Sequence, residues 1–174
     1  MEVIKYIERK IQTSVFFFET KLDIAKDKNY LIAKIEEGIK SNTNNNYKTN
    51  VKGKMTDWNY FVNDQIFLKY LVQGSQIIKD FFDISFSKMP EAWGIKMIEF
   101  NYTARHNHPN NNYSGILYLN DTETLTSFYQ LNFSIKPKEG TFLLFSSLLD
   151  HGTERHIGNI PKYAIPFNLK KITY

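Results

Sequence analysis

Apolar residues follow a helical period in the first half of the chain. A helix is predicted after Asp27, a residue type that caps helices, and it would end near Gly38. Its apolar positions lie three and four residues apart, at Leu31, Ile32, Ile35 and Ile39. A second helix is predicted over residues 62–82, where apolar pairs lie four apart: Ile66/Tyr70, Phe67/Leu71, Ile77/Phe81 and Ile78/Phe82.

Three shorter segments complete this first half. Residues 2–12 have apolar residues at helical spacing, and the β-branched and aromatic run from Ser14 to Phe18 predicts a buried strand. Residues 41–50 are polar and rich in asparagine, which is typical of a loop. We therefore expect residues 1–90 to supply one strand and the supporting helices.

From residue 92 the period becomes that of extended chain. Strands are predicted over residues 93–102, 114–119, 128–133, 141–145 and 162–169, with turns at Asn120-Asp121 and Pro137 to Gly140. Many short strands after two helices predict a mainly β protein with supporting helices (α+β), built as a double-stranded β-helix or jelly roll. The 174 residues would form a single domain whose core spans residues 91–174.

Composition excludes several classes of site. The chain has no cysteine, which rules out disulfides, zinc–thiolate sites and thiol nucleophiles. A net charge of +4 with only three arginines argues against a nucleic-acid partner. No apolar run approaches the ~20 residues of a membrane span, and no signal-peptide pattern is present. These features predict a cytoplasmic protein that has no membrane partner.

The four histidines all lie after residue 105, and three of them suggest a metal site. His106 and His108 are two apart in an extended segment, so their side chains share a face and lie about 6.6 Å apart along the strand. His151 follows an apolar strand that would anchor it. A lone histidine is more often structural, which is how we interpret His156. Three that converge would hold one metal ion and leave other positions on it open.

Two β-scaffold families use a His-X-His pair, and spacing separates them. A cupin would carry a glutamate three to five residues beyond the pair, where this chain has Asn111-Asn112-Tyr113. A cupin would also place its last histidine a few residues after a Pro-X-Gly turn, whereas Gly140 and His151 are eleven residues apart. The cupin alternative is therefore disfavoured.

The second family fits the order of the sequence blocks. His106-X-His108-Pro109, Ser114 to Leu119, Gly140 to His151 and Lys162 to Asn168 together resemble the 2-oxoglutarate/Fe(II)-dependent oxygenases. The resemblance covers residues 93–169 and is greatest to the prolyl-hydroxylase-like branch found in phages and marine bacteria. It implies that Fe(II) and 2-oxoglutarate are the cofactors, that ascorbate is a further candidate, and that O2 is the co-reactant.

The resemblance also implies the roles of individual residues. His106 matches the first iron ligand and His151 the last, while the carboxylate usual between them falls at His108. We favour His108 as the third ligand; water or Asp121 is the alternative. Lys162 stands where the family binds the distal carboxylate of 2-oxoglutarate.

The parity of the last strand supports that role for Lys162. Lys162, Ala164, Pro166 and Asn168 share one face, which suits an anion pocket, and the other face is suited to a core. A lysine is a point charge, so a hydroxyl helper is expected, for which Tyr118 and Ser146 are candidates. Asn168 would line the same pocket. Pro166 removes a ladder donor, which predicts an edge strand or a bulge.

The sequence therefore predicts a 2-oxoglutarate-dependent dioxygenase that hydroxylates an unidentified substrate and releases succinate and CO2. The substrate could be a small molecule or a protein side chain, and a phage-encoded enzyme would act in the cytoplasm of its host. The alternative is a jelly-roll binding or structural module whose metal site is degenerate or holds a non-redox ion, which the missing carboxylate at His108 favours.

Overall fold

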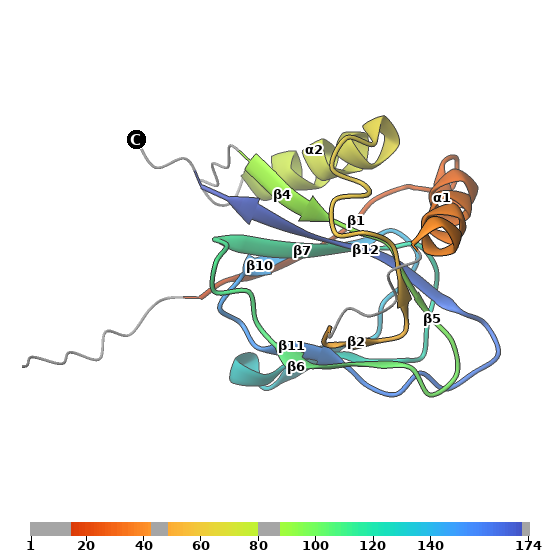
Figure 1. The fold of residues 1–174 in the computed structure, drawn as a ribbon. Helices are drawn as coiled ribbons and strands as arrows, with labels where there is room; N and C mark the ends of the chain where they lie inside the picture. Colours follow the sequence, from red (N-terminus) through yellow and green to blue (C-terminus); the bar gives the residue numbers. More distant parts are fainter. Residues whose placement is uncertain (1–14, 43–48, 80–87, 172–174) are drawn as a thin grey trace, which may run out of the picture.

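The computed structural model describes residues 15–42, 49–79 and 88–171. In this part of the chain two helices accompany a set of short strands (Figure 1). The helices are α1 (Lys28–Ser41) and α2 (Gln65–Lys79). The strands are β1 (Phe17–Lys21), β2 (Val51–Lys52), β3 (Lys54–Met55), β4 (Lys88–Ala92), β5 (Ile95–Met97), β6 (Tyr102–His106), β7 (Tyr113–Tyr118), β8 (Thr126–Phe128), β9 (Phe133–Ile135), β10 (Thr141–Ser146), β11 (His151–Thr153) and β12 (Lys162–Lys170).

The strands form two antiparallel sheets that face each other. The larger sheet has the order β1-β10-β7-β12-β5-β3, with β4 also paired to β12, and the smaller has the order β2-β6-β11-β8-β9. Figure 1 shows the smaller sheet beneath the larger one, with both helices on the opposite side of the larger sheet. This mainly β jelly roll with supporting helices confirms the predicted fold class.

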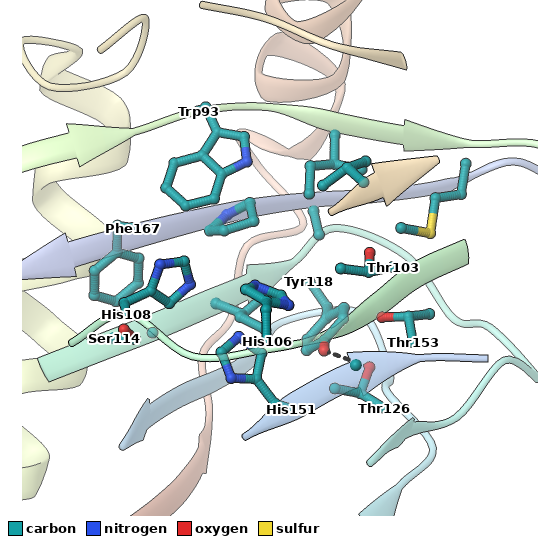
Figure 2. A pocket seen from close by; sticks show the side chains of 18 of the residues that line it. Trp93, Thr103, His106, His108, Ser114, Tyr118, Thr126, His151, Thr153 and Phe167 are labelled. Atoms are coloured by element: carbon teal, nitrogen blue, oxygen red, sulfur yellow. Dashed lines mark hydrogen bonds between the residues drawn. The ribbon is translucent and has the colours of Figure 1, made fainter. Parts of the chain in front are cut away.

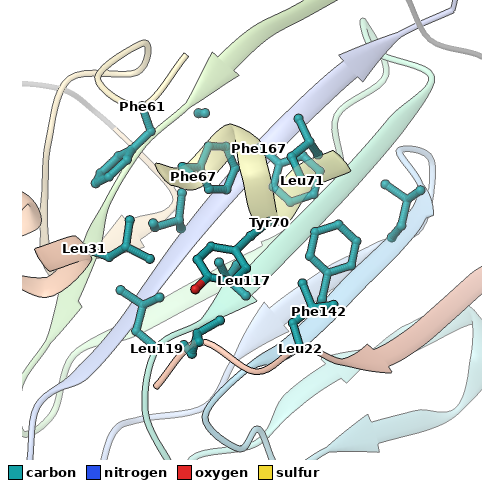
Figure 3. Packing of buried hydrophobic residues seen from close by; sticks show 14 of the residues in the cluster. Leu22, Leu31, Phe61, Phe67, Tyr70, Leu71, Leu117, Leu119, Phe142 and Phe167 are labelled. Carbon is teal, nitrogen blue, oxygen red and sulfur yellow. The ribbon is translucent and has the colours of Figure 1, made fainter. Parts of the chain in front are cut away.

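Alternation along the strands divides the core into two layers. Leu117, Phe142 and Phe167 point outward from the larger sheet and are buried with Leu31 of α1 and Phe67 of α2 (Figure 3). Their neighbours in sequence Ile116, Tyr118 and Leu143 point the other way, into the space between the sheets, where Ala164 of β12 joins them. Since successive strand residues face opposite sides, the helix-facing core fixes which side chains enter the inter-sheet space.

The helix starts agree only in part with the prediction. Asp27 precedes α1 as expected, but its carboxylate makes no cap hydrogen bond and instead accepts from the Tyr70 hydroxyl and the Lys69 ammonium of α2. Asp64 caps α2, because its Oδ1 accepts the backbone N–H of Phe67 at 2.8 Å. The predicted start at residue 62 was therefore early, and residues 80–82 lie outside the described part of the chain.

Two predicted strands are broken in the structure. The strand expected over residues 93–102 ends at Met97, because the chain turns through Phe100, whose φ of 67° is left-handed. The strand expected over residues 128–133 is a hairpin, in which β8 and β9 flank a short 3-10 helix that ends at Asn132 with φ 48°. Apolar content alone does not reveal either turn, since no glycine or proline marks it.

The predictions near the N-terminus have mixed outcomes. Strand β1 begins at Phe17, is half-buried and pairs only with β10, so it is an edge strand and not a buried one. The helical segment predicted over residues 2–12 lies outside the described residues, as does most of the Asn-rich loop, residues 43–48. The turn before β10 is present, and Gly140 adopts the positive φ of 75° that it requires.

Pro166 lies inside the larger sheet and not at its edge, so the expected edge position is wrong. Strand β12 pairs with β7 on one side, and with β5 and then β4 on the other. Pro166 falls between these last two partners, where its carbonyl accepts the backbone N–H of Trp93 at 3.1 Å. In an antiparallel strand the N–H and the C=O of one residue point to the same side. The N–H that Pro166 lacks would therefore point toward the gap between β5 and β4, so its absence removes no hydrogen bond between paired strands. The bulge expected at Pro166 is absent as well, because the register shift of β12 lies further along the strand, at Asn168/Lys170 against β4.

Gly115 of β7 provides a test of this packing. A Cβ at this position would lie 2.2 Å from the Phe167 ring and 2.5 Å from the Leu143 carbonyl oxygen. We expect Gly115→Ala to lower the free energy of unfolding by about 1–3 kcal/mol, measured by denaturant titration. Gly53→Ala is the matched control, since its nearest atom would be 3.1 Å away. Equal losses in the two variants would contradict this account.

Candidate metal centre and cosubstrate cavity

Two neighbouring strands of the smaller sheet bring His106 and His151 together. The two residues are cross-strand partners in the β6–β11 ladder, and their ring centroids are 4.3 Å apart. His106 ends β6 and His151 begins β11, so both lie at the same end of the inter-sheet cavity (Figure 2). The antiparallel register therefore pairs two histidines that are 45 residues apart in the sequence.

His108 joins them from the segment that follows β6. Its backbone N–H donates to the carbonyl of Ser147 at 2.8 Å, which holds this segment beside the chain that leads to His151. The ligating nitrogens of His106, His108 and His151 all lie within 4.8 Å of one another. Asp121, the alternative third ligand, pairs instead with Lys138 and accepts the backbone N–H of Glu139. The structure therefore brings together the three residues predicted to hold the metal.

Hydrogen bonds orient two of the rings. Nδ1 of His106 lies 2.8 Å from the Ala104 carbonyl oxygen, and Nδ1 of His151 lies 2.9 Å from the Leu149 carbonyl oxygen. A carbonyl oxygen only accepts, so each Nδ1 carries the proton and each Nε2 keeps a free lone pair. Such backbone support of the far ring nitrogen is the usual arrangement for histidines that ligate metals.

Burial keeps all three imidazoles neutral. Desolvation lowers the pKa of His151 to about 3 and, with the charge of His106 as a second cause, that of His108 to about 4. Desolvation also lowers the pKa of His106. Near pH 7 the cluster thus offers three uncharged nitrogen donors, which suits a divalent transition metal such as iron, cobalt, nickel or zinc. The residues fit the metal that the sequence resemblance implies.

An ion pair on the outer surface braces the two histidine strands. Arg105 precedes His106, Asp150 precedes His151, and Nη2 of Arg105 donates to Oδ2 of Asp150 at 2.6 Å. Asn107 donates to the other carboxylate oxygen at 2.8 Å. Arg105 also lies 4.6 Å from the centre of the Tyr129 ring. These contacts tie together the chain segments that carry the candidate ligands.

Lys162 lines the same cavity and is almost wholly buried, with 3% of its surface exposed. Its Nζ lies 3.4 Å from the Thr126 hydroxyl, 3.5 Å from the Thr153 hydroxyl and 5.1 Å from the Tyr118 ring centre. None of the described carboxylates forms an ion pair with it. Desolvation lowers the pKa of Lys162 to about 7, so near neutral pH the ligand-free lysine is only partly charged, and a bound anion would favour its ammonium form.

The other residues predicted for the cosubstrate divide into two groups. Tyr118 lines the cavity, and its hydroxyl lies 2.8 Å from that of Thr126. Ser146 and Asn168 do not line it: the Ser146 hydroxyl accepts the backbone N–H of Phe16, and the Asn168 side chain bonds to Ser114 and Glu91. The strand parity of Asn168 did not show that its side chain is occupied by these partners, which are distant in sequence.

Sequence reasoning missed the two threonines beside Lys162. Thr126 and Thr153 lie on paired strands, β8 and β11, at directly opposite positions. Threonine is common in strands, so neither residue stands out in the sequence. His156, interpreted as a structural residue, is buried: it contacts the Thr124 hydroxyl at 2.7 Å and the Ile160 carbonyl at 2.8 Å.

The fold of this chain is similar to that of several solved structures, although its sequence matches no known family. No protein-family model and no curated protein matches the sequence. Solved structures do match: a viral collagen prolyl hydroxylase from Paramecium bursaria Chlorella virus-1, in complex with 2-oxoglutarate, has a TM-score of 0.66 at 14% identity over 90% of this chain and 96% of that one. A Pseudomonas putida prolyl-4-hydroxylase has a TM-score of 0.66 at 13% identity, over 90% of this chain and 93% of that one.

The chain has the fold of the prolyl hydroxylases. HygX from Streptomyces hygroscopicus, solved with nickel and 2-oxoglutarate bound, is also similar, with a TM-score of 0.59 at 10% identity over 91% of this chain and 83% of that one. These likenesses confirm the predicted jelly-roll fold, which this chain shares with the prolyl hydroxylases and with HygX. Among the described residues, neither helix has the length and apolarity needed to cross a bilayer.

Proposed function

We propose that this chain is an Fe(II)/2-oxoglutarate-dependent dioxygenase that hydroxylates its substrate and releases succinate and CO2. One observation carries the proposal: a buried lysine that forms no ion pair with any described carboxylate shares its cavity with three converging, neutral histidines. A dicarboxylic keto acid fits both features, because its keto acid end can bind a metal held by the histidines and its distal carboxylate can bind the lysine. The prolyl-hydroxylase fold, and 2-oxoglutarate in two structures that share it, support this assignment.

In this proposal each residue has a defined task. His106, His108 and His151 hold Fe(II), and Lys162 binds the distal carboxylate of 2-oxoglutarate. Bound Fe(II) supplies the redox chemistry that couples decarboxylation of the keto acid to substrate hydroxylation. The Tyr118 ring and hydroxyl lie beside Lys162 and, with Thr126, form the wall of the carboxylate end of the cavity.

Lys162 also has a reason to be buried. An ion pair formed away from water is stronger than one at the surface, and the two threonine hydroxyls supply polar neighbours for the ligand carboxylate. Because Lys162 is already desolvated in the ligand-free protein, the free-energy cost of burying it is part of folding and does not reduce the ligand's binding free energy. Binding of the dianion restores a counter-charge, which favours 2-oxoglutarate over neutral keto compounds.

The substrate class stays open between a small molecule and a protein side chain. A prolyl hydroxylase from Trichoplax adhaerens, solved with a hypoxia-inducible-factor peptide, shares the fold with a TM-score of 0.64 at 15% identity over 89% of this chain and 83% of that one. His106 and His108 are only partly buried, so the metal end of the cavity is the side from which a substrate would enter. We place the reaction in the cytoplasm.

The proposal is tested with the purified chain under argon. Fe(II) is added first and 2-oxoglutarate second, and we expect a weak visible charge-transfer band that appears only when both are present. Admission of air, with ascorbate as reductant, should then produce succinate, and His106→Ala should abolish it. Metal binding without a band or succinate would refute the proposal and support the alternative, a jelly-roll binding module or cupin-like metalloprotein.

A further inference from the structure

Lys162 places a primary amine in an enclosed and mostly apolar part of the cavity. The residue is 3% exposed, faces Met97 across the β12–β5 ladder, and has Ala164 as the next residue on its own face of β12. The neighbours of its Nζ are two hydroxyls, Thr126 at 3.4 Å and Thr153 at 3.5 Å, and both distances are long for hydrogen bonds. The amine is therefore held in place by weak contacts that a reaction at the nitrogen could replace.

The groups around this amine do not stabilise its ammonium form. The other titratable residues that line the cavity are Tyr118 of β7, His106 of β6, His151 of β11 and His108, with no carboxylate and no second cation among the described residues. Desolvation lowers the pKa of Lys162 to about 7, so about half of the amine is unprotonated near neutral pH. An ordinary lysine, with a pKa near 10.4, is unprotonated in roughly one molecule in 2,500 at that pH. The lone pair that makes an amine nucleophilic is thus present here.

Polar groups beside Nζ suit the two oxygens of a carbamate. Carbamylation replaces one N–H hydrogen by a carboxylate group, so two acceptor oxygens would lie directly beyond Nζ, next to the Thr126 and Thr153 hydroxyls. A hydroxyl accepts from an amine and donates to an oxygen anion, so the same two residues can bind either form. The Tyr118 hydroxyl lies 2.8 Å from that of Thr126, and Figure 2 shows the three side chains together.

We propose that Lys162 is a carbamylation site, at which CO2 adds reversibly to Nζ when 2-oxoglutarate is absent, and that the carbamate blocks 2-oxoglutarate binding. The Nζ lone pair forms a bond to the carbon of CO2, one C=O π bond becomes an oxygen anion, and one proton passes from the nitrogen to water. The residue then carries a negative charge where the distal carboxylate would bind, so the two ligands exclude each other. The blocking of 2-oxoglutarate rests on the proposed function, whose reaction also releases CO2 in this cavity.

The test exposes the full chain, without added metal, to isotope-labelled bicarbonate and CO2 at slightly alkaline pH. Sodium chloride at equal ionic strength is the reference. A carbamate is detected by carbon NMR, is fixed as its ethyl ester with triethyloxonium ion, and is mapped by mass spectrometry. We expect the trapped group on the peptide that contains Lys162 and its loss in Lys162→Met. Lys96→Met should keep it, because Lys96 pairs with Glu36 at 2.6 Å and does not line the cavity.

A second variant tests the hydroxyl contacts while Lys162 is kept. Thr153→Val removes one donor at nearly constant shape and should weaken carbamylation about tenfold, as for loss of a hydrogen bond to a charged group. Thr103→Val is the matched control, since Thr103 lies opposite Thr153 in the β6–β11 ladder and lines the same cavity. In the described part of the chain it makes no hydrogen bond with Lys162. An equal loss in both variants, or none in either, would contradict the role given to Thr153.

Competition is measured by calorimetric titration of 2-oxoglutarate into the chain loaded with Zn(II), at rising CO2. When half of Lys162 is carbamylated, the apparent Kd of 2-oxoglutarate should rise about twofold, since only the free amine binds it. Saturating 2-oxoglutarate should in turn abolish the trapped carbamate.

The outcomes separate this inference from the proposed function. A chain that binds Zn(II) and 2-oxoglutarate but yields no carbamate on Lys162 would overturn the modification site and leave the proposed function. Carbamate on Lys162 in a chain that does not bind 2-oxoglutarate would overturn the proposed function and leave the site. Carbamate that persists at saturating 2-oxoglutarate would refute the competition between the two ligands.

Discussion

Replacing His151 by alanine is expected to weaken Co(II) or Fe(II) binding by more than a hundredfold, because it removes the most buried of the three ligands. Loss of a group that merely supports a ligand already costs about 10–100-fold in metal affinity, so loss of a ligand itself should cost more. His151 is 6% exposed and fixed by its own Nδ1 hydrogen bond, so no other side chain can move into its place at low cost. Isothermal titration with Co(II) measures the effect.

His156→Gln is the matched control for this result. His156 is also a buried histidine, 3% exposed, but its two ring nitrogens contact Thr124 and Ile160 outside the candidate metal cluster. We expect it to lower the melting temperature and leave the Co(II) affinity unchanged. An unaltered Co(II) affinity in His151→Ala, or an equal loss in both variants, would show that the cluster is not the metal site.

Lys162→Met is expected to weaken 2-oxoglutarate binding about a hundredfold, equivalent to ~3 kcal/mol, since truncating one partner of a buried charge pair typically costs 2–5 kcal/mol. The methionine keeps the length and apolar contacts of the lysine stem. The same substitution should raise the melting temperature of the ligand-free protein, because it removes a buried, desolvated amine that forms no ion pair with any described carboxylate. Binding is measured by calorimetry on the metal-loaded chain.

The difference in stability between the wild type and Lys162→Met is expected to change with pH in a defined direction. Burial lowers the pKa of Lys162 to about 7 in the folded chain, whereas an unfolded lysine titrates near 10.4. Between these values the unfolded state binds more protons, so the ligand-free wild type gains stability as pH rises from about 7 to about 10. The stability advantage of Lys162→Met should shrink over the same range, and 2-oxoglutarate binding to the wild type should weaken.

Lys96→Met is the control for both measurements. Lys96 lies on β5, next to the β12 strand that carries Lys162, but its ammonium pairs with Glu36 at 2.6 Å and the residue does not line the cavity. We expect it to leave 2-oxoglutarate affinity unchanged. Undiminished affinity in Lys162→Met would remove the lysine from the cosubstrate site and with it the main support for the proposed function.

The departure at His108 is the feature that sets this cavity apart from the carboxylate-bearing pattern the sequence otherwise resembles. The structure holds His108 through its backbone bond to Ser147 and keeps its imidazole neutral. A neutral ligand in place of an anionic one changes the charge that the bound metal presents, and not the number of ligands. Metal binding and 2-oxoglutarate binding are therefore tested by separate substitutions in this chain.

Part of the candidate site could be predicted because several of its residues lie close together within one segment of the sequence. His106 and His108 lie two residues apart in the sequence, although β6 ends at His106, and the alternation of β12 placed Lys162, Ala164 and Pro166 on the cavity side. Fold class followed from the change of period near residue 92. These inferences depend only on the two-residue repeat of extended chain, which the sequence displays directly.

Other features depend on partners that are distant in sequence. Asn168 has the parity for the cavity, but Ser114 and Glu91 occupy its side chain, and Ser146 is occupied by the backbone of Phe16. Strand breaks at Phe100 and Asn132 carry no glycine or proline signal. In each case the deciding contact joins residues that no local pattern connects.

The sequence by itself indicated the two helices, the fold class and the three candidate histidines, since hydrophobic period and His-X-His spacing are properties of short segments. Only the tertiary structure decided that His151 pairs with His106, that Thr126 and Thr153 adjoin Lys162, and that Asn168 is held by Ser114 and Glu91. The physical reason is that register between strands and competition for hydrogen-bond partners are settled by the packing of the whole chain.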